Sequence, residues 1–147
     1  MSTHSDMQDW TKALEAEVEP DNEPVEVKIL DRNGEPYRDA DGNPAVIYAL
    51  GKYSDAVKAH DSKKRRQRSK AVQSGKRIRE DDEEMTIQTA ERVAAATTGW
   101  RLAIGGVDVP FNRQNAIALY TKAEWVADQV WAAMHAHADF FEEKSSS

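Results

Sequence analysis

Two histidines and an aspartate lie close together near the end of the sequence, in the stretch HAHAD from His135 to Asp139. Imidazole and carboxylate groups are metal ligands, so zinc binding is the first chemistry to consider. On a helix, however, residues two apart point in different directions, so His135 and His137 would not chelate one ion. His135 and Asp139 stand one turn apart, but two ligands make a weak site. The pattern favours a helix surface, and we predict no metal site.

The stretch DADGN, from Asp39 to Asn43, resembles half of a calcium-binding loop. Such a loop needs oxygen ligands at positions 1, 3 and 5, glycine at position 6 and glutamate at position 12. Counted from Asp39, the glycine falls at position 4 and position 12 is Leu50. The spacing therefore favours a hairpin turn over a calcium site.

Side chains that could carry covalent or acid–base catalysis form no recognisable set. The 147 residues include no cysteine, which excludes disulfides and thiolate metal sites and is typical of a reducing compartment. No nucleophilic serine motif or phosphate-binding loop occurs, and no pair of carboxylates has an apolar frame that would raise a pKa. We therefore predict a protein that is not an enzyme and that binds no cofactor.

The strongest charge feature is a basic run from Lys58 to Arg79, which holds ten of the twenty Lys and Arg residues and is opposed only by Asp61. The acidic block EDDEE follows it, and the formal net charge of the chain is −6. Adjacent blocks of opposite sign are typical of a solvated helix pair or a self-neutralising connection. The run lacks the interleaved aromatic residues of nucleic-acid-binding surfaces. A solvated helix face is the favoured interpretation, ahead of a docking surface for an acidic protein and of nucleic-acid binding.

Large apolar side chains concentrate in the last third of the chain, where three of the four tryptophans lie. A small aromatic core is the simpler interpretation, but aromatic residues also dominate surfaces that bind protein partners. The candidate partner-binding residues are Trp131, Met134, Phe141, Trp100 and Phe111.

The elements that must position these residues follow from the hydrophobic pattern. Residues 1–23 predict a flexible N-terminus with a short amphipathic helix, which two prolines end. Residues 24–52 predict a β-hairpin, because the apolar residues of VEVKI alternate, two glycine-containing turns follow, and AVIYALG is prone to form a strand. Residues 53–80 predict a basic, exposed helix or linker that begins at Ser54.

Residues 81–141 predict a helical C-terminal region with a short ribbon at 100–109, and residues 142–147 predict a disordered tail. The fold class expected is α+β, predominantly α, with an N-terminal β-hairpin followed by a small helical bundle.

Three local signals refine the C-terminal region. Gly99 is placed to close the first of its helices in a C-terminal position. The pair Gly105-Gly106 is expected to turn the ribbon, and Asn112 can cap the following helix.

The last helix, over residues 123–141, has an apolar face wider than one neighbouring helix would cover. We expect one stripe to belong to the protein's own core and a second stripe to be available to a partner or a second copy. The core stripe contains Trp125, Val126, Val130 and Phe140, and the available stripe contains Trp131, Met134 and Phe141.

An ordered set of residues in the second half of the chain resembles the C-terminal signature of tail assembly chaperones of long-tailed (siphovirus-type) bacteriophages. These residues are Gly99-Trp100, Gly106, Phe111, Asn115-Ala116, Leu119-Tyr120, Trp125, Gln129-Val130 and Asp139-Phe140. The first half is similar to such proteins as well, with VKILDRNGEP, DADGNPAVIYALGK and an Arg-rich segment after Ser54-Asp55. The resemblance spans roughly residues 25–141.

This resemblance implies a chaperone of virion morphogenesis in the host cytoplasm. Its partners would be the tape-measure protein, whose long helical chain it keeps soluble, and the tail-tube protein, with self-association left open. Nucleic acid is not an expected partner, and neither is a membrane, because the sequence has no apolar run of 18 residues. Two alternatives stay open: a nucleic-acid-associated accessory protein that uses the basic run at 58–79, and a structural tail or head-completion protein.

Overall fold

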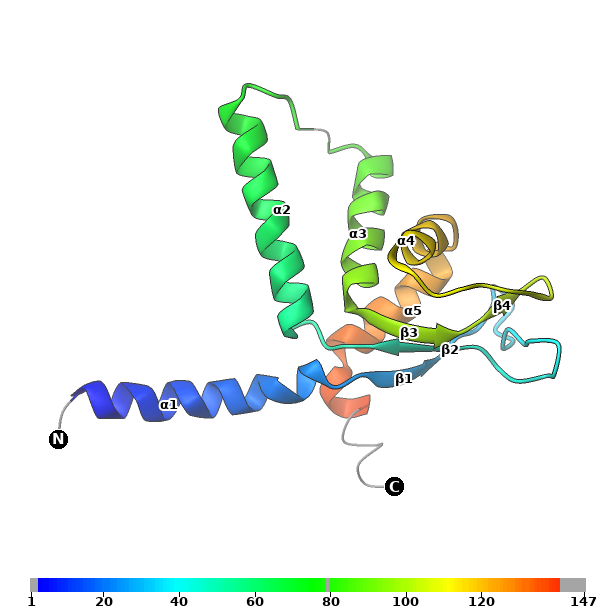
Figure 1. Ribbon diagram of the computed structural model, residues 1–147, viewed down its shortest axis with the longest axis horizontal. Coiled ribbons are helices and arrows are strands. Elements are labelled where there is room, and N and C mark those ends of the chain that lie inside the picture. Colours follow the sequence, from blue (N-terminus) through cyan, green and yellow to red (C-terminus); the bar gives the residue numbers. More distant parts are fainter. Residues whose placement is uncertain (1–2, 79, 141–147) are drawn as a thin grey trace.

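The computed structural model describes residues 3–78 and 80–140, with side chains from residue 9 onward. The fold class is α+β and predominantly α, as predicted (Figure 1). In chain order the elements are α1 (Thr3–Val18), the 3-10 turn η1 (Glu19–Asn22), β1 (Val25–Lys28), β2 (Val46–Ala49), α2 (Asp55–Gln73), α3 (Asp82–Ala96), β3 (Thr97–Arg101), β4 (Ala103–Ile104), β5 (Val107–Asp108), α4 (Arg113–Lys122) and α5 (Glu124–His135).

The main sheet is antiparallel and has three strands in the order β1-β2-β3. Strand β2 is central, so that Ile47 pairs with Val27 on one side and with Trp100 on the other. The predicted antiparallel pairing of the two strands is present, but the pair is not an isolated N-terminal hairpin. A 16-residue helix precedes it, and a strand from residues 97–101 completes the sheet. The reason is tertiary: β2 is buried along most of its length and needs a partner on each edge.

The hydrophobic core lies between the sheet and α5. Helices α3 and α4 pack against each other and against α5 and complete the core. Val126 and Val130 of α5 are completely buried, as is Val93 of α3. The wide apolar face of α5 is covered in part by the sheet and in part by α3 and α4.

Two similar turns separate β1 from β2, one at Asp31 and one at Asp39. In each turn the aspartate carboxylate accepts hydrogen bonds from the backbone N–H groups two and four residues later. A glycine with positive φ, Gly34 at 82° and Gly42 at 83°, lets each turn close. The stretch DADGN is thus a turn, as predicted, and the N–H of Asn43 lowers the pKa of Asp39.

The basic run forms most of α2. Hydrogen bonds at both ends define where this helix begins and ends. The Ser54 side chain accepts from the Val57 N–H at the N-terminus. At the other end Gly75 has a positive φ of 76°, and the N–H groups of Gly75 and Lys76 bond back to Val72 and Ala71. This is the bonding pattern of a Schellman motif. The alternative that residues 53–80 form a linker is therefore wrong for most of that stretch.

The predicted role of Gly99 as the end of a helix is wrong. Helix α3 passes directly into β3 at Thr97, and Gly99 lies inside that strand. The buried Thr97 hydroxyl bonds to the Val93 carbonyl at 2.8 Å and to the Tyr120 hydroxyl at 2.7 Å. The Thr97 side chain thus satisfies one of the carbonyls at the end of α3, and the Tyr120 hydroxyl of α4 is its hydrogen-bond partner.

The other local predictions for this region are confirmed. Gly105 and Gly106 both have positive φ and join β4 to β5 in a two-residue turn. Asn112 caps α4 by accepting from the Asn115 N–H at 2.7 Å. The predicted tail, residues 142–147, lies outside the described residues. In the part of the chain that the structure covers, none of the helices combines the length and apolar content of a membrane span.

Candidate partner-binding surfaces

A groove between α2 and α3 is one of the concave surfaces of the described residues. Its cavity is about 450 Å³, within the ~300–1,000 Å³ range of clefts that take ligands or side chains. More of its surface is apolar than polar, because the arginine and lysine stems line it together with Ala71 and Ile78. We call it the basic groove. Its lining residues are His60, Asp61, Lys64, Arg65, Gln67, Arg68, Ala71, Lys76, Arg77, Ile78, Glu84, Gln88 and Arg92.

Ion pairs between the two helices hold the groove in shape. Near its base Arg92 pairs with Asp61 at 3.1 Å, and Lys64 pairs with Glu91 at 3.0 Å. Arg68 also pairs with Glu80 in the connection that links the two helices. Beyond these pairs the helices run apart toward the connecting loop (Figure 1). The predicted helix pair of opposite charges is thus present. The two helices are not packed together along their whole length, and a concave surface lies between them.

The rim of the groove carries an excess of positive charge. Arg65, Lys76 and Arg77 are exposed and take part in none of the ion pairs described between residues 9 and 140. His60 lies at the base of the groove, where burial and the nearby Lys64 lower its pKa. The groove is therefore suited to an acidic ligand whose central part is apolar.

One predicted partner-binding residue, Trp131, lies next to the groove without lining it. Its ring is half-buried, and the guanidinium of Arg92 stacks over it at 5.1 Å from the centroid. Because Arg92 also lines the groove, Trp131 supports the groove wall from below.

Two other predicted residues, Trp100 and Phe111, meet in an edge-to-face contact with ring centroids 4.9 Å apart. The Trp100 indole N–H donates to the Val109 carbonyl, so its ring is oriented by the ribbon. Ile104 and Val107 of the same ribbon are exposed. We call these four apolar residues, Trp100, Ile104, Val107 and Phe111, the aromatic patch. The structure thus brings together two residues that the sequence places eleven positions apart.

The remaining predicted residues are not available surface. Met134 is only 1% exposed, because the loop after β2 covers it and the Lys52 N–H bonds to its carbonyl. Conversely, Phe140 was expected in the core and is 37% exposed. Helix α5 ends at His135 and the chain turns at Ala136, which moves the following residues off the helical stripe. Phe141 lies outside the described residues.

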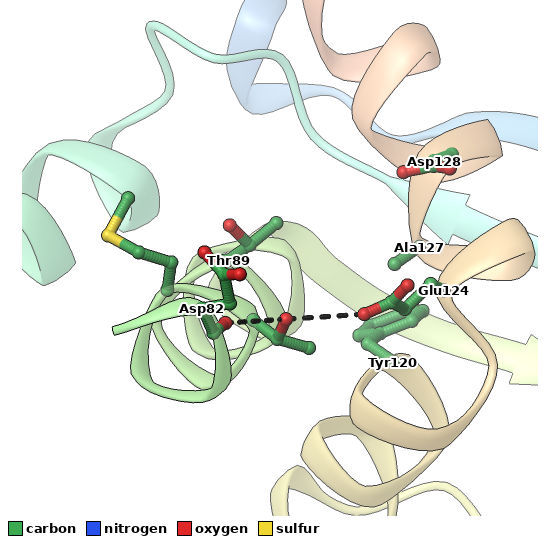
Figure 2. Close-up of a pocket in the computed structure, with 8 residues that line it drawn as sticks. Asp82, Thr89, Tyr120, Glu124, Ala127 and Asp128 are labelled. Atoms are coloured by element: carbon green, nitrogen blue, oxygen red, sulfur yellow. Dashed lines mark hydrogen bonds between the residues drawn. The ribbon is translucent and has the colours of Figure 1, made fainter. Parts of the chain in front are cut away.

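A second cavity of about 380 Å³ lies between α3 and the α4–α5 corner (Figure 2). Asp82, Glu124 and Asp128 line it, and the Thr86 hydroxyl donates to Glu124 at 3.2 Å. The labelled carboxylates do not converge on one point in Figure 2. Within residues 9–78 and 80–140, no cluster of three His, Asp or Glu side chains is arranged to hold a metal ion. The cavity is an acidic recess without an evident catalytic geometry.

A buried polar cluster near the end of α5 was missed by the sequence reasoning. His137 is 2% exposed, its Nε2 lies 2.6 Å from the Glu23 carbonyl, and its Nδ1 lies 3.7 Å from the Asp21 carboxylate. Asp21 also accepts from the Tyr53 N–H at 3.0 Å. The cluster joins η1, the loop after β2 and the end of the chain. The predicted helix surface for HAHAD is therefore wrong for His137, because residues 114 and 116 positions away, Glu23 and Asp21, cover and contact its ring.

Several residues of the phage-chaperone resemblance have structural roles here. The Gln129 side chain bonds to both the N–H and the carbonyl of Leu30 at 2.8 Å, so it acts as an additional strand partner for that loop. The Trp125 indole donates to the Tyr37 hydroxyl. Both side chains thus attach the segment between β1 and β2 to α5.

Comparison of the chain with protein-family models, with curated proteins and with solved structures found no match.

Proposed function

We propose that this chain is a non-catalytic assembly chaperone that receives an amphipathic helix of a partner protein in the basic groove. The groove itself carries the proposal: ion pairs hold α2 and α3 together near its base, and beyond them the helices diverge around a largely apolar lining. Proteins that bind amphipathic helices use this arrangement, in which apolar side chains enter the groove and rim charges fix the orientation.

The resemblance to tail assembly chaperones of siphovirus-type phages supplies the partner class. The client would be the tape-measure protein, a long helical chain whose apolar stripe would aggregate in the host cytoplasm unless covered. The aromatic patch is separate from the groove in sequence and position, and it offers a second surface for tail-tube subunits. Two distinct surfaces suit a protein that holds one partner and recruits another during virion morphogenesis.

Co-expression with the tape-measure protein encoded in the same genome tests this function. The measurement is the fraction of tape-measure protein that stays in the supernatant after centrifugation. The unmodified chain should raise that fraction, and a floor variant, Ala71→Glu with Ile78→Glu, should lose the effect because both residues line the groove. Val107→Glu in the aromatic patch serves as the control and should keep it. An unchanged soluble fraction in the presence of the unmodified chain would rule the function out.

A second candidate function is nucleic-acid association through the outer side of α2. Lys63, Arg66 and Lys70 are exposed at helical spacing there. Phosphate contacts weaken steeply as salt rises, whereas an apolar helix-in-groove contact changes little. A gel shift that survives physiological salt and disappears when these three residues become Gln would favour this candidate over the chaperone.

A further inference from the structure

Helix α1 has an apolar side that its own chain leaves uncovered. Trp10 and Leu14 stand one helical turn apart and are 55% and 50% exposed. The extensive contacts of α1 are with η1, and the helix projects away from the body of the molecule (Figure 1). An exposed tryptophan next to an exposed leucine is the kind of anchor pair that partner-binding helices present.

The direction of α1 is set by bonds at its C-terminal end. It continues without a break into η1, and η1 is tied to the body. The Asp21 carbonyl accepts from the Gly51 N–H at 2.9 Å, its carboxylate accepts from Tyr53, and the Asn22 side chain accepts from Asp55 at 2.8 Å. With η1 tied in this way and α1 continuous with it, α1 projects away from the body and does not occupy the groove of its own chain (Figure 1).

The basic groove and α1 match in charge. Helix α1 contains four acidic residues and one lysine, a net charge of −3. The residues that line the groove include six basic and two acidic side chains, a net charge of +4. Oppositely charged surfaces steer association and fix the register of a contact.

The two elements also match in length. The 16 residues of α1 span about 24 Å, and the α2 residues that line the groove, from His60 to Ala71, span about 17 Å at ~1.5 Å per residue. An α1 helix laid along the groove would therefore contact it over most of its length.

The exposed area of the chain leaves room for such a contact. Its accessible surface is 9944 Å² for 16.5 kDa, about 2,400 Å² more than the roughly 7,600 Å² expected of a compact monomer. A stable protein interface buries about 800 Å² on each partner. Docking of a projecting helix would remove part of this excess.

We propose that α1 of one copy docks in the basic groove of a second copy of this chain. Trp10 and Leu14 contact the apolar floor, and the α1 carboxylates face Arg65, Lys76 and Arg77 on the rim. This inference rests on the proposed function, since it assigns the same groove. It deepens that function: α1 covers the groove before the client helix arrives and competes with it afterwards.

Two charge-reversal variants test the contact by light scattering on the full chain. The α1 variant carries Lys at three described carboxylates, and the rim variant carries Glu at three rim positions. Like charges would then face each other, so each variant alone should associate more than ~100-fold more weakly than the unmodified chain. The substitutions are Asp9→Lys, Glu15→Lys and Glu17→Lys in α1, and Arg65→Glu, Lys76→Glu and Arg77→Glu on the rim.

Mixing the two variants is the decisive experiment. The acidic α1 of the rim variant meets the basic groove of the α1 variant, and the basic α1 of the α1 variant meets the acidic groove of the rim variant. Association should therefore return in the mixture only. A mixture that stays monomeric would overturn the proposal, and so would an unmodified chain that is monomeric at high concentration.

Two further variants separate the contact from general effects of charge. A control variant makes the same charge change at three exposed carboxylates outside α1 and should leave association intact. Its substitutions are Glu26→Lys, Glu35→Lys and Asp128→Lys. Trp10→Ala should weaken association about 30-fold or more, as loss of a tryptophan anchor does. Failure of the carboxylate control to associate would overturn the proposal. Because these measurements contain no tape-measure protein, the outcome is independent of the solubility test of the proposed function.

Discussion

Gly51 is expected to be one of the least replaceable residues outside the apolar core. An added Cβ would lie 2.8 Å from the Asp21 Cβ and would overlap the carboxylate group itself. That carboxylate accepts from the Tyr53 N–H and lies beside the buried His137. Gly51→Ala therefore has to displace the group that ties η1 to the loop after β2.

The expected cost follows from two terms. Losing a hydrogen bond to a charged acceptor costs about 1.5–3 kcal/mol, and overpacking a filled site costs about 1–3 kcal/mol. We expect Gly51→Ala to lower the free energy of unfolding by about 2.5–6 kcal/mol. In a chain of this size that corresponds to a fall in Tm of roughly 5–24 °C.

Urea unfolding followed by tryptophan fluorescence measures this cost, and Gly99→Ala is the matched control. Gly99 has no positive φ, and an added Cβ would meet only a Tyr48 ring atom at 4.0 Å. Replacing it should therefore be neutral or stabilise by up to ~1 kcal/mol. In an Asp21→Ala background, Gly51→Ala should cost little. Equal effects of the two glycine substitutions, or strict additivity with Asp21→Ala, would refute the reasoning.

Three further predictions concern single side chains. Gln129→Ala removes two hydrogen bonds to Leu30 and should lower the free energy of unfolding by about 1–3 kcal/mol in urea titrations; no change would mean that the loop does not need this attachment. Burial lowers the pKa of His60 below 6.5, so His60 is protonated at a higher pH in the unfolded chain than in the folded chain, and stability should fall as the pH drops through and below about 6.5. The urea midpoint of His60→Gln should not show this fall. The N–H of Asn43 lowers the pKa of Asp39 below 3.8, so the stability that the Asp39 carboxylate contributes is present above pH 3.8 and is lost as the pH falls further. Amide exchange of Asn43 should therefore accelerate below pH 3.8. In Asp39→Asn, the exchange of Asn43 should follow the intrinsic exchange rate without this added acceleration.

Local features were predictable because the groups that make them are neighbours in the sequence. The turn at Asp39, the Gly105-Gly106 ribbon and the Asn112 cap all depend on hydrogen bonds or backbone angles within about five residues. The start of α2 at Ser54 belongs to the same class. The sequence by itself therefore determined most of the elements and the places where several of them begin.

The sequence could also indicate which parts of the site carry charge, but not the shape they make. The basic run was recognised from composition, whereas the groove depends on α2 and α3 being paired near its base and diverging beyond those ion pairs (Figure 1). The edge-to-face contact of Trp100 and Phe111 likewise depends on the path of the ribbon between them.

Only the tertiary structure decided which apolar residues are covered. Met134 is buried and Phe140 exposed, the reverse of the helical-stripe prediction, because α5 ends at His135 and the loop after β2 covers Met134. Gly99 became a strand residue because β2 needs a second partner, although its local setting also suits a helix end. The contact of His137 with Glu23 joins residues 114 positions apart. Burial depends on what packs against a side chain from elsewhere in the chain, and that information is not contained in the periodicity of a single segment.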